Sequence, residues 1–372
     1  MKRKLVFFVS TDRYFISHRL DLAIHALNSN FDVFLITSIT CKNYEKKIMD
    51  SKIKVINIKL HRSGLNIFSE LLFFIKLLKS LIKIKPDIIH NVALKPVIYG
   101  SIASFLLRAK LTINAIAGTG IVFNKISKTS NLLKLFIKLI LSFALKRGQV
   151  IVQNNNDKEF VKKLGINLKN ITLQNGVGVN LLKYKNENSL QEKPRILLAS
   201  RLLWSKGIGD YIEAIKILNK KDRKFEFLLA GFSDEENPDH IKTEIINGWV
   251  DDKLINFLGW VEDMPKLLSS IDVFCLPSYY GEGVPKSLIE ATASSIPCIT
   301  TDTAGCRDVV SNNNNGFLVA IKSPEEIASR IEEIVSNKDI YLKMSKKSRL
   351  IAEKKFNQNI IIKQTLSIYG SH

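Results

Sequence analysis

Residues 273–294 read VFCLPSYYGEGVPKSLIEATAS. The run Val273–Pro277 is continuous and apolar, as in a strand that is buried on both faces of a parallel sheet. Gly281, Gly283 and Pro285 follow, and these residue types are typical of a loop that leads into a helix. A helical pattern begins after Pro285. A strand, a loop and a helix in this order predict one unit of a doubly wound α/β sheet.

The same pattern recurs along the whole chain, where short apolar runs alternate with longer amphipathic stretches. In the first half the expected strands are Leu5–Val9, Val33–Thr37, Val55–Ile58, Ile88–His90, Leu111–Ala115 and Val150–Gln153. In the second half they are Arg195–Ser200, Phe225–Ala230, Ile255–Leu258, Val273–Pro277, Pro297–Thr301 and Gly316–Val319. We therefore predict two successive α/β domains, each Rossmann-like and doubly wound.

The stretch Lys183–Pro194 is polar and nearly free of apolar residues, as interdomain linkers are. It divides the chain into an expected first domain over 1–182, a linker over 183–194 and a second domain over 195–356. A last helical pattern follows over Asn357–Tyr369.

Composition narrows the class of protein. A chain of 372 residues with 46% hydrophobic content can bury a large core. The four cysteines form no C-x-x-C pair and lie near no histidine cluster, so we expect neither disulfides nor zinc, and a reducing, cytoplasmic compartment. The N-terminal apolar run Leu5–Val9 ends after five residues without a cleavage site, so we interpret it as a strand and not as a signal peptide.

The positive charge is concentrated in the first half. Residues 1–185 carry 31 Lys and Arg against 9 Asp and Glu, a net charge of +22, whereas residues 186–372 carry 24 against 26, a net charge of −2. This asymmetry indicates that the first half faces an anionic partner, either a nucleic acid or a membrane surface.

Two expected helices of the first half, Leu65–Lys85 and Lys125–Arg147, place lysines among large aliphatic and aromatic residues. The lysines exclude a membrane span. The helices could instead lie flat on an anionic leaflet with their lysines at the headgroups, or they could cover the sheet with a solvated lysine face. The charge excess favours membrane contact for at least one of them.

Arg201 and Lys206 lie between a strand end and a helical pattern that begins near Gly209. Ligands of parallel sheets bind at the carboxyl ends of the strands. Two cations ahead of a helix N-terminus would make a clamp for a diphosphate, because their charges and the helix dipole act in the same direction. The alternative is a solvated Arg and Lys beside a turn.

Glu282 falls in the glycine-flanked loop and Glu290 in the second turn of the expected helix. This spacing is typical of two carboxylates that bind different hydroxyl groups beside a helix start that accepts phosphate. Glutamates that merely complement a helix dipole would give the same pattern.

Arg201 with Lys206, the E-x7-E pair Glu282 and Glu290, and the segment Gly305–Asp308 together resemble the donor half of retaining glycosyltransferase family 4. In the first half, Ser17-His18-Arg19-Leu20 and Asn91–Gly100 resemble the branch that builds capsule and O-antigen on lipid-linked glycans. The resemblance covers nearly the whole chain. It implies the GT-B fold, in which two Rossmann-like domains face each other across a cleft and a C-terminal helix, here 357–372, crosses back to the first domain.

The resemblance also assigns roles. It implies that Arg201 and Lys206 hold the donor diphosphate, that Glu290 binds the ribose hydroxyls and that Glu282 contacts the transferred sugar. Gly283 and Val284 would offer backbone N–H groups, and Gly305 would belong to the same nucleotide-binding set. This distribution suits glycosyl transfer, because positive charge develops on the sugar and negative charge on the departing phosphate.

No D-x-D sequence occurs in the chain, so we expect no metal and no other cofactor. The first half departs from the family pattern, because Ala117-Gly118-Thr-Gly120 lacks the usual histidine. His18, at an expected strand-to-helix turn, is the remaining candidate for a catalytic histidine, although a capping or packing role would explain it equally well.

The resemblance implies a retaining transfer of an N-acetylhexosamine or hexose from a nucleotide sugar, with UDP as the expected carrier, to a polyprenyl-diphosphate-linked glycan of surface polysaccharide. The expected partners are the donor, the lipid-linked acceptor and an anionic membrane surface contacted by the lysine-rich helices. The expected location is cytoplasmic, on the inner face of the membrane. The alternatives are a GT-B epimerase or phosphorylase, and a basic nucleic-acid-binding protein, which the interleaved aliphatic residues disfavour.

Overall fold

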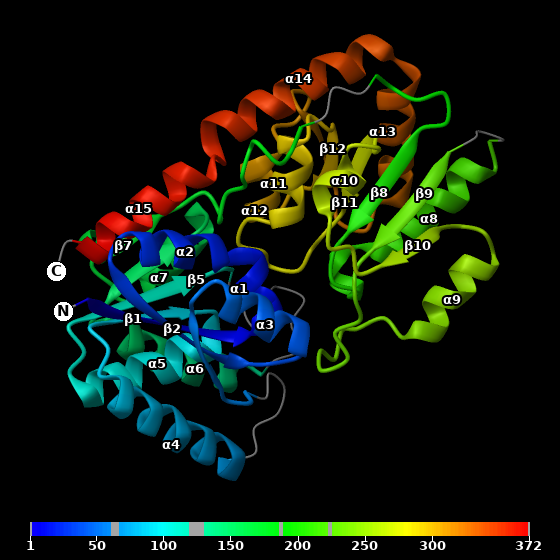
Figure 1. Cartoon of the computed structure of the whole chain (residues 1–372). Helices are drawn as coiled ribbons and strands as arrows, with labels where there is room; N and C mark the ends of the chain where they lie inside the picture. The colour runs from blue at the N-terminus through cyan, green and yellow to red at the C-terminus, as the bar shows by residue number, and fades with distance from the viewer. Residues whose placement is uncertain (1, 61–66, 119–129, 186–188, 222–224, 371–372) are drawn as a thin grey trace. The chain divides into compact units, whose positions relative to one another are not determined.

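The computed structural model describes residues 2–60, 67–118, 130–185, 189–221 and 225–370 (Figure 1). Two compact units are present, one made of residues 1–177 with 360–372 and the other of residues 178–359. Parts of three expectations lie outside the described residues. They are the end of the loop that contains Gly120, the beginnings of both lysine-rich helices, and residues 186–188 of the expected linker.

The first unit is built on one parallel sheet with the strand order β3-β2-β1-β4-β5-β6-β7. Its strands are β1 (Arg3–Thr11), β2 (Phe31–Ser38), β3 (Lys54–Asn57), β4 (Ile88–Val92), β5 (Leu111–Ile116), β6 (Gln149–Val152) and β7 (Ile171–Leu173). Its helices are α1 (Asp12–His18), α2 (Leu20–Asn28), α3 (Lys42–Asp50), α4 (Ile67–Ile84), α5 (Leu94–Leu107), α6 (Asn131–Leu145) and α7 (Asn155–Lys163), with a 3-10 turn at Leu168–Asn170.

The side chains of β1 alternate between two cores, because successive residues of a strand point to opposite faces of the sheet. Leu5, Phe7 and Val9 pack in the core that α2 and the last helix, α15 (Gln358–Gly370), close. Val6 and Phe8 pack in the opposite core, under α4. Figure 1 shows α4, α5 and α6 on one side of this sheet and α2 and α15 on the other. The continuous apolar strands are thus covered on both faces.

The last helix is fastened to the first sheet by buried polar contacts. The hydroxyl of Tyr369 lies 2.6 Å from Nδ1 of His90 on β4, and Gln174 donates to the Thr365 hydroxyl at 3.0 Å. Burial lowers the pKa of His90 well below its usual value and raises that of Tyr369, so both groups are neutral at physiological pH. His90 therefore serves packing inside this unit.

The second unit has a parallel sheet with the order β10-β9-β8-β11-β12-β13. The strands are β8 (Arg195–Ala199), β9 (Glu226–Ala230), β10 (Asn256–Gly259), β11 (Val273–Leu276), β12 (Cys298–Thr301) and β13 (Gly316–Val319). The helices are α8 (Ile208–Asn219), α9 (Thr243–Asp251), α10 (Met264–Leu268), α11 (Lys286–Ala293), α12 (Ala304–Val309), α13 (Pro324–Ser336) and α14 (Lys338–Lys355), with a 3-10 turn at Trp204–Lys206.

All twelve expected strands are present within a residue or two of their expected ends, and the two parallel-sheet units confirm the predicted fold class. The strand β7 was missed, because three residues after a 3-10 turn are too short to show a periodic pattern. The stretch Lys183–Pro194 belongs to the second unit instead of lying between the units. Tyr184 is buried there, and the Gln191 side chain donates to Asp272 at 3.0 Å.

Candidate functional site

The candidate site lies at the carboxyl ends of β8 and β11. These strands are hydrogen-bonded neighbours, and the strand order reverses between them, since β9 follows β8 on one side and β12 follows β11 on the other. A crevice forms at such a reversal, because the loops after the two strands leave in opposite directions. The loop after β8 carries Arg201 and Lys206, and the loop after β11 carries Glu282.

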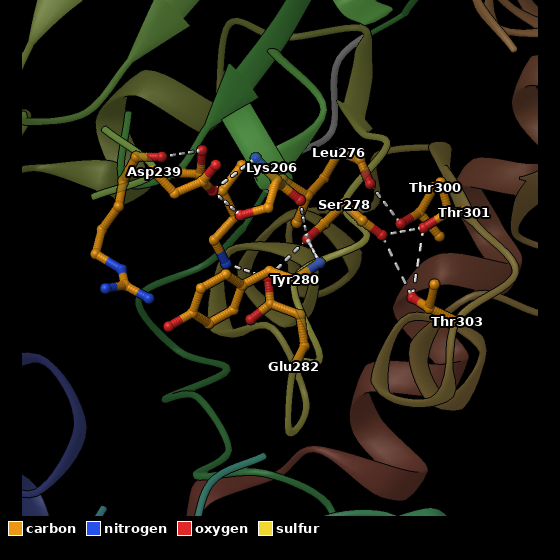
Figure 2. Close-up of polar contacts among 12 residues, drawn as sticks. Lys206, Asp239, Leu276, Ser278, Tyr280, Glu282, Thr300, Thr301 and Thr303 are labelled. Carbon is orange, nitrogen blue, oxygen red and sulfur yellow. Dashed lines mark hydrogen bonds and ion pairs between the residues drawn. The ribbon is translucent and has the colours of Figure 1, made fainter. Parts of the chain in front are cut away.

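The structure brings Arg201, Lys206 and Glu282 together. Lys206 Nζ forms an ion pair with Glu282 Oε1, and both side chains are nearly buried, with 9% and 13% of their surface exposed. The ring of Tyr280 lies 5.0 Å from the Arg201 guanidinium and 5.0 Å from Lys206 Nζ. Figure 2 shows Lys206 and Glu282 converging beside this ring. The two predicted cations thus lie against the same aromatic ring.

The loop after β8 is held by two carboxylates that follow β9. Arg201 donates to Asp234 Oδ2 at 2.8 Å, and the Asp234 side chain is 6% exposed. Asp239 accepts hydrogen bonds from the backbone N–H of Ser205, at 2.9 Å, and from its hydroxyl (Figure 2). Gly207 ends the turn with a φ of 76°, and a Cβ there would overlap the Pro277 carbonyl. The positions of Arg201 and Lys206 are therefore fixed from outside their own loop.

The loop after β11 is held by hydroxyl groups. Ser278, which is fully buried, donates to Glu282 Oε1 at 3.0 Å. The Ser278 carbonyl accepts from the hydroxyls of Thr301 and Thr303 (Figure 2), and Tyr279 N–H donates to the Ser205 carbonyl at 2.9 Å. The last of these bonds ties the two loops to each other, so residues at the ends of β8, β11 and β12 together hold the loop that carries Glu282.

Gly283 and Gly305 meet at the beginning of α12. A Cβ on Gly305 would overlap the Gly283 carbonyl and would lie 3.2 Å from the Glu282 carbonyl oxygen. Gly283 and Val284 are both buried at this contact. Glycine at 305 is thus what allows α12 to approach the loop that carries Glu282.

Glu290 lies on α11, in the second turn as expected, and is 6% exposed. Its Oε1 accepts a hydrogen bond from the Tyr184 hydroxyl at 2.8 Å and forms an ion pair with Lys286 Nζ at 3.0 Å. Pro285 is the residue before the first helical position. The two carboxylates of the pair therefore have different partners, Lys206 for Glu282 and Tyr184 with Lys286 for Glu290.

His18 belongs to the first unit and is the last residue of α1, not part of a strand-to-helix turn as the sequence predicted. The turn is shorter than expected, because Thr11 accepts a hydrogen bond from Tyr14 N–H and α1 begins at once. The imidazole stacks on the Tyr14 ring at 4.1 Å, and its Nδ1 lies 2.6 Å from the Ser17 hydroxyl.

Five residues that shape the site were missed: Tyr184, Asp234, Asp239, Ser278 and Tyr280. Three of them had a readable signal. Asp234 and Asp239 follow a predicted strand at the same carboxyl edge as Arg201. Tyr184 is the one aromatic residue of the polar stretch Lys183–Pro194, which is the pattern of an anchoring side chain.

Thiol chemistry has little support in this region. Cys275, Cys298 and Cys306 are buried, and burial raises the pKa of Cys298 to about 12, so the thiol stays protonated. Within the described part of the chain, no three His, Cys, Asp or Glu side chains are grouped so that they could hold a metal ion.

The arrangement defines a class. Two side-chain cations and a carboxylate lie at the reversal point of a doubly wound sheet, and α8 begins directly after Gly207, an arrangement that can bind a phosphate-bearing ligand. Residues 182–351 match the family model of glycosyl transferases group 1, and residues 4–155 match that of the glycosyl transferase 4-like family. Together the two matches cover most of the chain. The chain therefore belongs to the glycosyltransferases that these two models describe, and it is an enzyme of the transferase class.

Relatives agree with this assignment, and solved structures agree with the fold. The chain is 29% identical, over 93% of both chains, to the N,N′-diacetylbacillosaminyl-diphospho-undecaprenol α-1,3-N-acetylgalactosaminyltransferase of Campylobacter jejuni. It is 27% identical, over 87% of this chain and 84% of the relative, to an Escherichia coli α-1,3-galactosyltransferase whose named substrates are UDP-Gal and GlcNAc-diphosphoundecaprenol. A Rickettsia africae glycosyltransferase structure matches with a TM-score of 0.76 and 21% identity, over 99% of this chain and 98% of that one. Anabaena HepE with UDP-glucose matches with a TM-score of 0.78 and 16% identity, over 99% and 100%. The fold is GT-B, as the sequence predicted.

Proposed function

We propose that this glycosyltransferase moves an N-acetylhexosamine or a hexose from a UDP-linked donor to a polyprenyl-diphosphate-linked glycan, in the synthesis of surface polysaccharide such as O-antigen or capsule. The observation that carries the proposal is the convergence of Arg201, Lys206 and Glu282 at the ends of β8 and β11. The named substrates of the Campylobacter and Escherichia relatives support the choice of donor and acceptor.

The donor diphosphate binds to Arg201 and Lys206 at the beginning of α8. In transfer the bond between the sugar and the diphosphate breaks, so negative charge grows on the departing phosphate and positive charge on the sugar ring. Fixed cations stabilise the first and the Glu282 carboxylate stabilises the second. Lys206 is already paired with Glu282. When the donor binds, Lys206 either leaves the carboxylate for the phosphate or contacts both.

The remaining residues complete the donor site. Glu290 binds the ribose hydroxyls, and the backbone N–H groups of Gly283 and Val284 bind beside the diphosphate. Gly305 keeps the loop in place through its contact with Gly283. Two side-chain cations take the place of a metal, and the sugar keeps its anomeric configuration, as in the family that the sequence resembles.

His18 is our candidate on the acceptor side. The Ser17 hydroxyl holds its Nδ1, and Tyr14 stacks on the ring, so the imidazole has a fixed orientation at the end of α1. We propose that Nε2 contacts the acceptor or the transferred sugar.

The donor is tested by thermal unfolding in the presence of UDP-, GDP- and TDP-linked hexoses and N-acetylhexosamines. A ligand that binds the native state alone raises its stability by about 2.7 kcal/mol at a hundredfold excess over Kd. We expect the melting temperature to rise with UDP-sugars, and the rise to be much smaller in Arg201→Ala. A rise with GDP- or TDP-sugars alone would contradict the choice of UDP, and no rise with any of them would contradict the site.

We also propose that the enzyme acts at the inner face of the cell membrane, held there by α4 and α6. The exposed apolar side chains of these helices are Phe68, Leu71, Leu72, Ile75, Ile82, Leu132, Leu133, Leu135, Phe136, Leu139 and Phe143. Lys76, Lys79 and Lys138 are exposed among them. An apolar surface with interleaved cations suits an anionic leaflet, in which the rings and aliphatic groups enter the headgroup region. No helix of the described residues is long and apolar enough to cross a membrane.

Replacing Lys76, Lys79, Lys134 and Lys138 with glutamine is expected to weaken binding to anionic vesicles, because each lysine near such a surface contributes about 1 kcal/mol. Sedimentation with phosphatidylglycerol vesicles at physiological salt measures the effect. The matched control removes four exposed lysines from α14, by Lys343→Gln, Lys346→Gln, Lys347→Gln and Lys354→Gln, and should bind as the wild type does. Equal loss in both variants would show that total charge, and not this face, determines binding.

A further inference from the structure

Glu290 is a buried carboxylate that is held by one of its two oxygens. The Tyr184 hydroxyl at 2.8 Å and Lys286 Nζ at 3.0 Å both contact Oε1. Burying a carboxylate is costly unless hydrogen bonds and a counter-charge replace its water. The Tyr184 phenol provides the hydrogen bond to Oε1 and the Lys286 ammonium provides the counter-charge. Together they fix the orientation of the carboxylate.

The backbone of Tyr184 is fixed independently of its hydroxyl. Arg349, on α14, donates to the Tyr184 carbonyl at 2.6 Å and to the Ala293 carbonyl at 2.7 Å. Ala293 is the last residue of α11, the helix that carries Glu290. One guanidinium therefore joins the backbone of Tyr184 to the helix that the Tyr184 side chain contacts. With Tyr184 8% exposed, the phenol has a defined place beside Glu290.

We propose that Tyr184 is a positioning residue for the nucleotide: it holds Oε1 of Glu290, so that the other carboxylate oxygen meets the ribose hydroxyls of the donor. The inference rests on the proposed role of Glu290. Tyr184 touches no reacting atom in this account, and its contribution is to the recognition of ribose. Loss of its hydroxyl should therefore reduce the preference of the enzyme for a nucleotide that carries ribose hydroxyls.

The experiment compares the affinities of UDP and 2′,3′-dideoxyuridine diphosphate, measured by calorimetry for the wild type, Tyr184→Phe and Glu290→Gln. A hydrogen bond to a charged group corresponds to about tenfold or more in Kd, so the wild type should prefer UDP by about that factor. In Tyr184→Phe the preference should fall by about threefold or more, because an untethered carboxylate loses orientation. The affinity for the dideoxy compound should stay unchanged.

A matched control separates positioning from packing. Tyr211 is another buried tyrosine of the same unit, and its hydroxyl donates to the Ile196 carbonyl at 2.8 Å. Tyr211→Phe removes a buried hydroxyl far from Glu290 in sequence and should lower thermal stability without altering the preference for UDP over the dideoxy compound. The melting temperature of Tyr184→Phe verifies that the variant is folded during the binding measurement.

Three results would count against the proposal in distinguishable ways. If the wild type prefers UDP and Tyr184→Phe keeps the full preference, the inference is wrong and the role of Glu290 stands. If Tyr184→Phe weakens both ligands equally, the tyrosine is structural and the inference is again wrong. If the wild type binds both compounds alike, the ribose role of Glu290 in the proposed function fails, and the inference fails with it.

Discussion

Lys206→Ala is expected to weaken binding of the nucleotide-sugar donor by about tenfold to a hundredfold, the range of a charge-assisted hydrogen bond. The same change leaves the nearly buried Glu282 carboxylate without its lysine. Removing one partner of a buried ion pair destabilises a protein by about 3–5 kcal/mol. Affinity and the free energy of unfolding should therefore both fall. Arg201→Ala should weaken donor binding to a similar extent. Glu290→Ala should weaken it less, because ribose hydroxyls carry no charge.

Calorimetry with the donor at a temperature where circular dichroism shows a folded variant separates the two effects. Lys216→Ala is the matched control, since Lys216 also forms an ion pair in the second unit, with Glu213, but both side chains are about half exposed. We expect that variant to bind the donor normally and to lose little stability. Unchanged donor affinity in Lys206→Ala, Arg201→Ala and Glu290→Ala together would mean that the donor binds elsewhere.

Gly305→Ala is expected to have an equally large effect without removing any polar group. The added methyl would overlap the Gly283 carbonyl, and backbone cannot yield as a flexible side chain can. The loop that carries Glu282, or the beginning of α12, must then move. A shift of about 1 Å in a catalytic group can cost about a hundredfold in rate. We therefore expect a loss of turnover of that order, together with weaker donor binding.

Gly248→Ala provides the comparison. Gly248 lies inside α9, and apart from its chain neighbours and the backbone of its own helix no atom lies within 4 Å of the place that its Cβ would occupy. Alanine is favoured over glycine in a helix interior by about 0.5–1 kcal/mol, so this variant should be slightly more stable and fully active. Steady-state turnover and thermal unfolding of both variants measure the difference. Wild-type turnover in Gly305→Ala would contradict the role of the contact between Gly283 and Gly305.

The strands could be predicted from the sequence because parallel strands that are buried on both faces are continuous apolar runs, and Leu5–Val9 or Val273–Pro277 stand out for that reason. Arg201, Lys206 and Glu282 could be selected as candidates from the sequence because ligands bind where such strands end. The ion pair between Lys206 and Glu282 could not be predicted from the sequence, because it depends on β8 and β11 being neighbours in the sheet.

Residues that hold the site through tertiary contacts were beyond the reach of local patterns. Asp239 contacts Ser205 across 34 positions of sequence and Tyr184 contacts Glu290 across 106. Polarity alone made Lys183–Pro194 resemble a linker, although one aromatic ring and one amide attach it to the second unit. A polar composition indicates that a segment is solvated. It does not indicate which of its side chains pack against the rest of the protein.

The central claim is that the enzyme transfers a sugar from a nucleotide to a lipid-linked glycan. The most direct test incubates it with UDP-N-acetylhexosamine or UDP-hexose, in EDTA, with and without a polyprenyl-diphosphate-linked glycan, and measures free UDP together with the sugar that enters the lipid extract. We expect both to appear in equal amounts when the acceptor is present, and neither to be formed by Arg201→Ala. Release of UDP that does not depend on the acceptor, or conversion of the donor into another UDP-sugar without transfer, would contradict it.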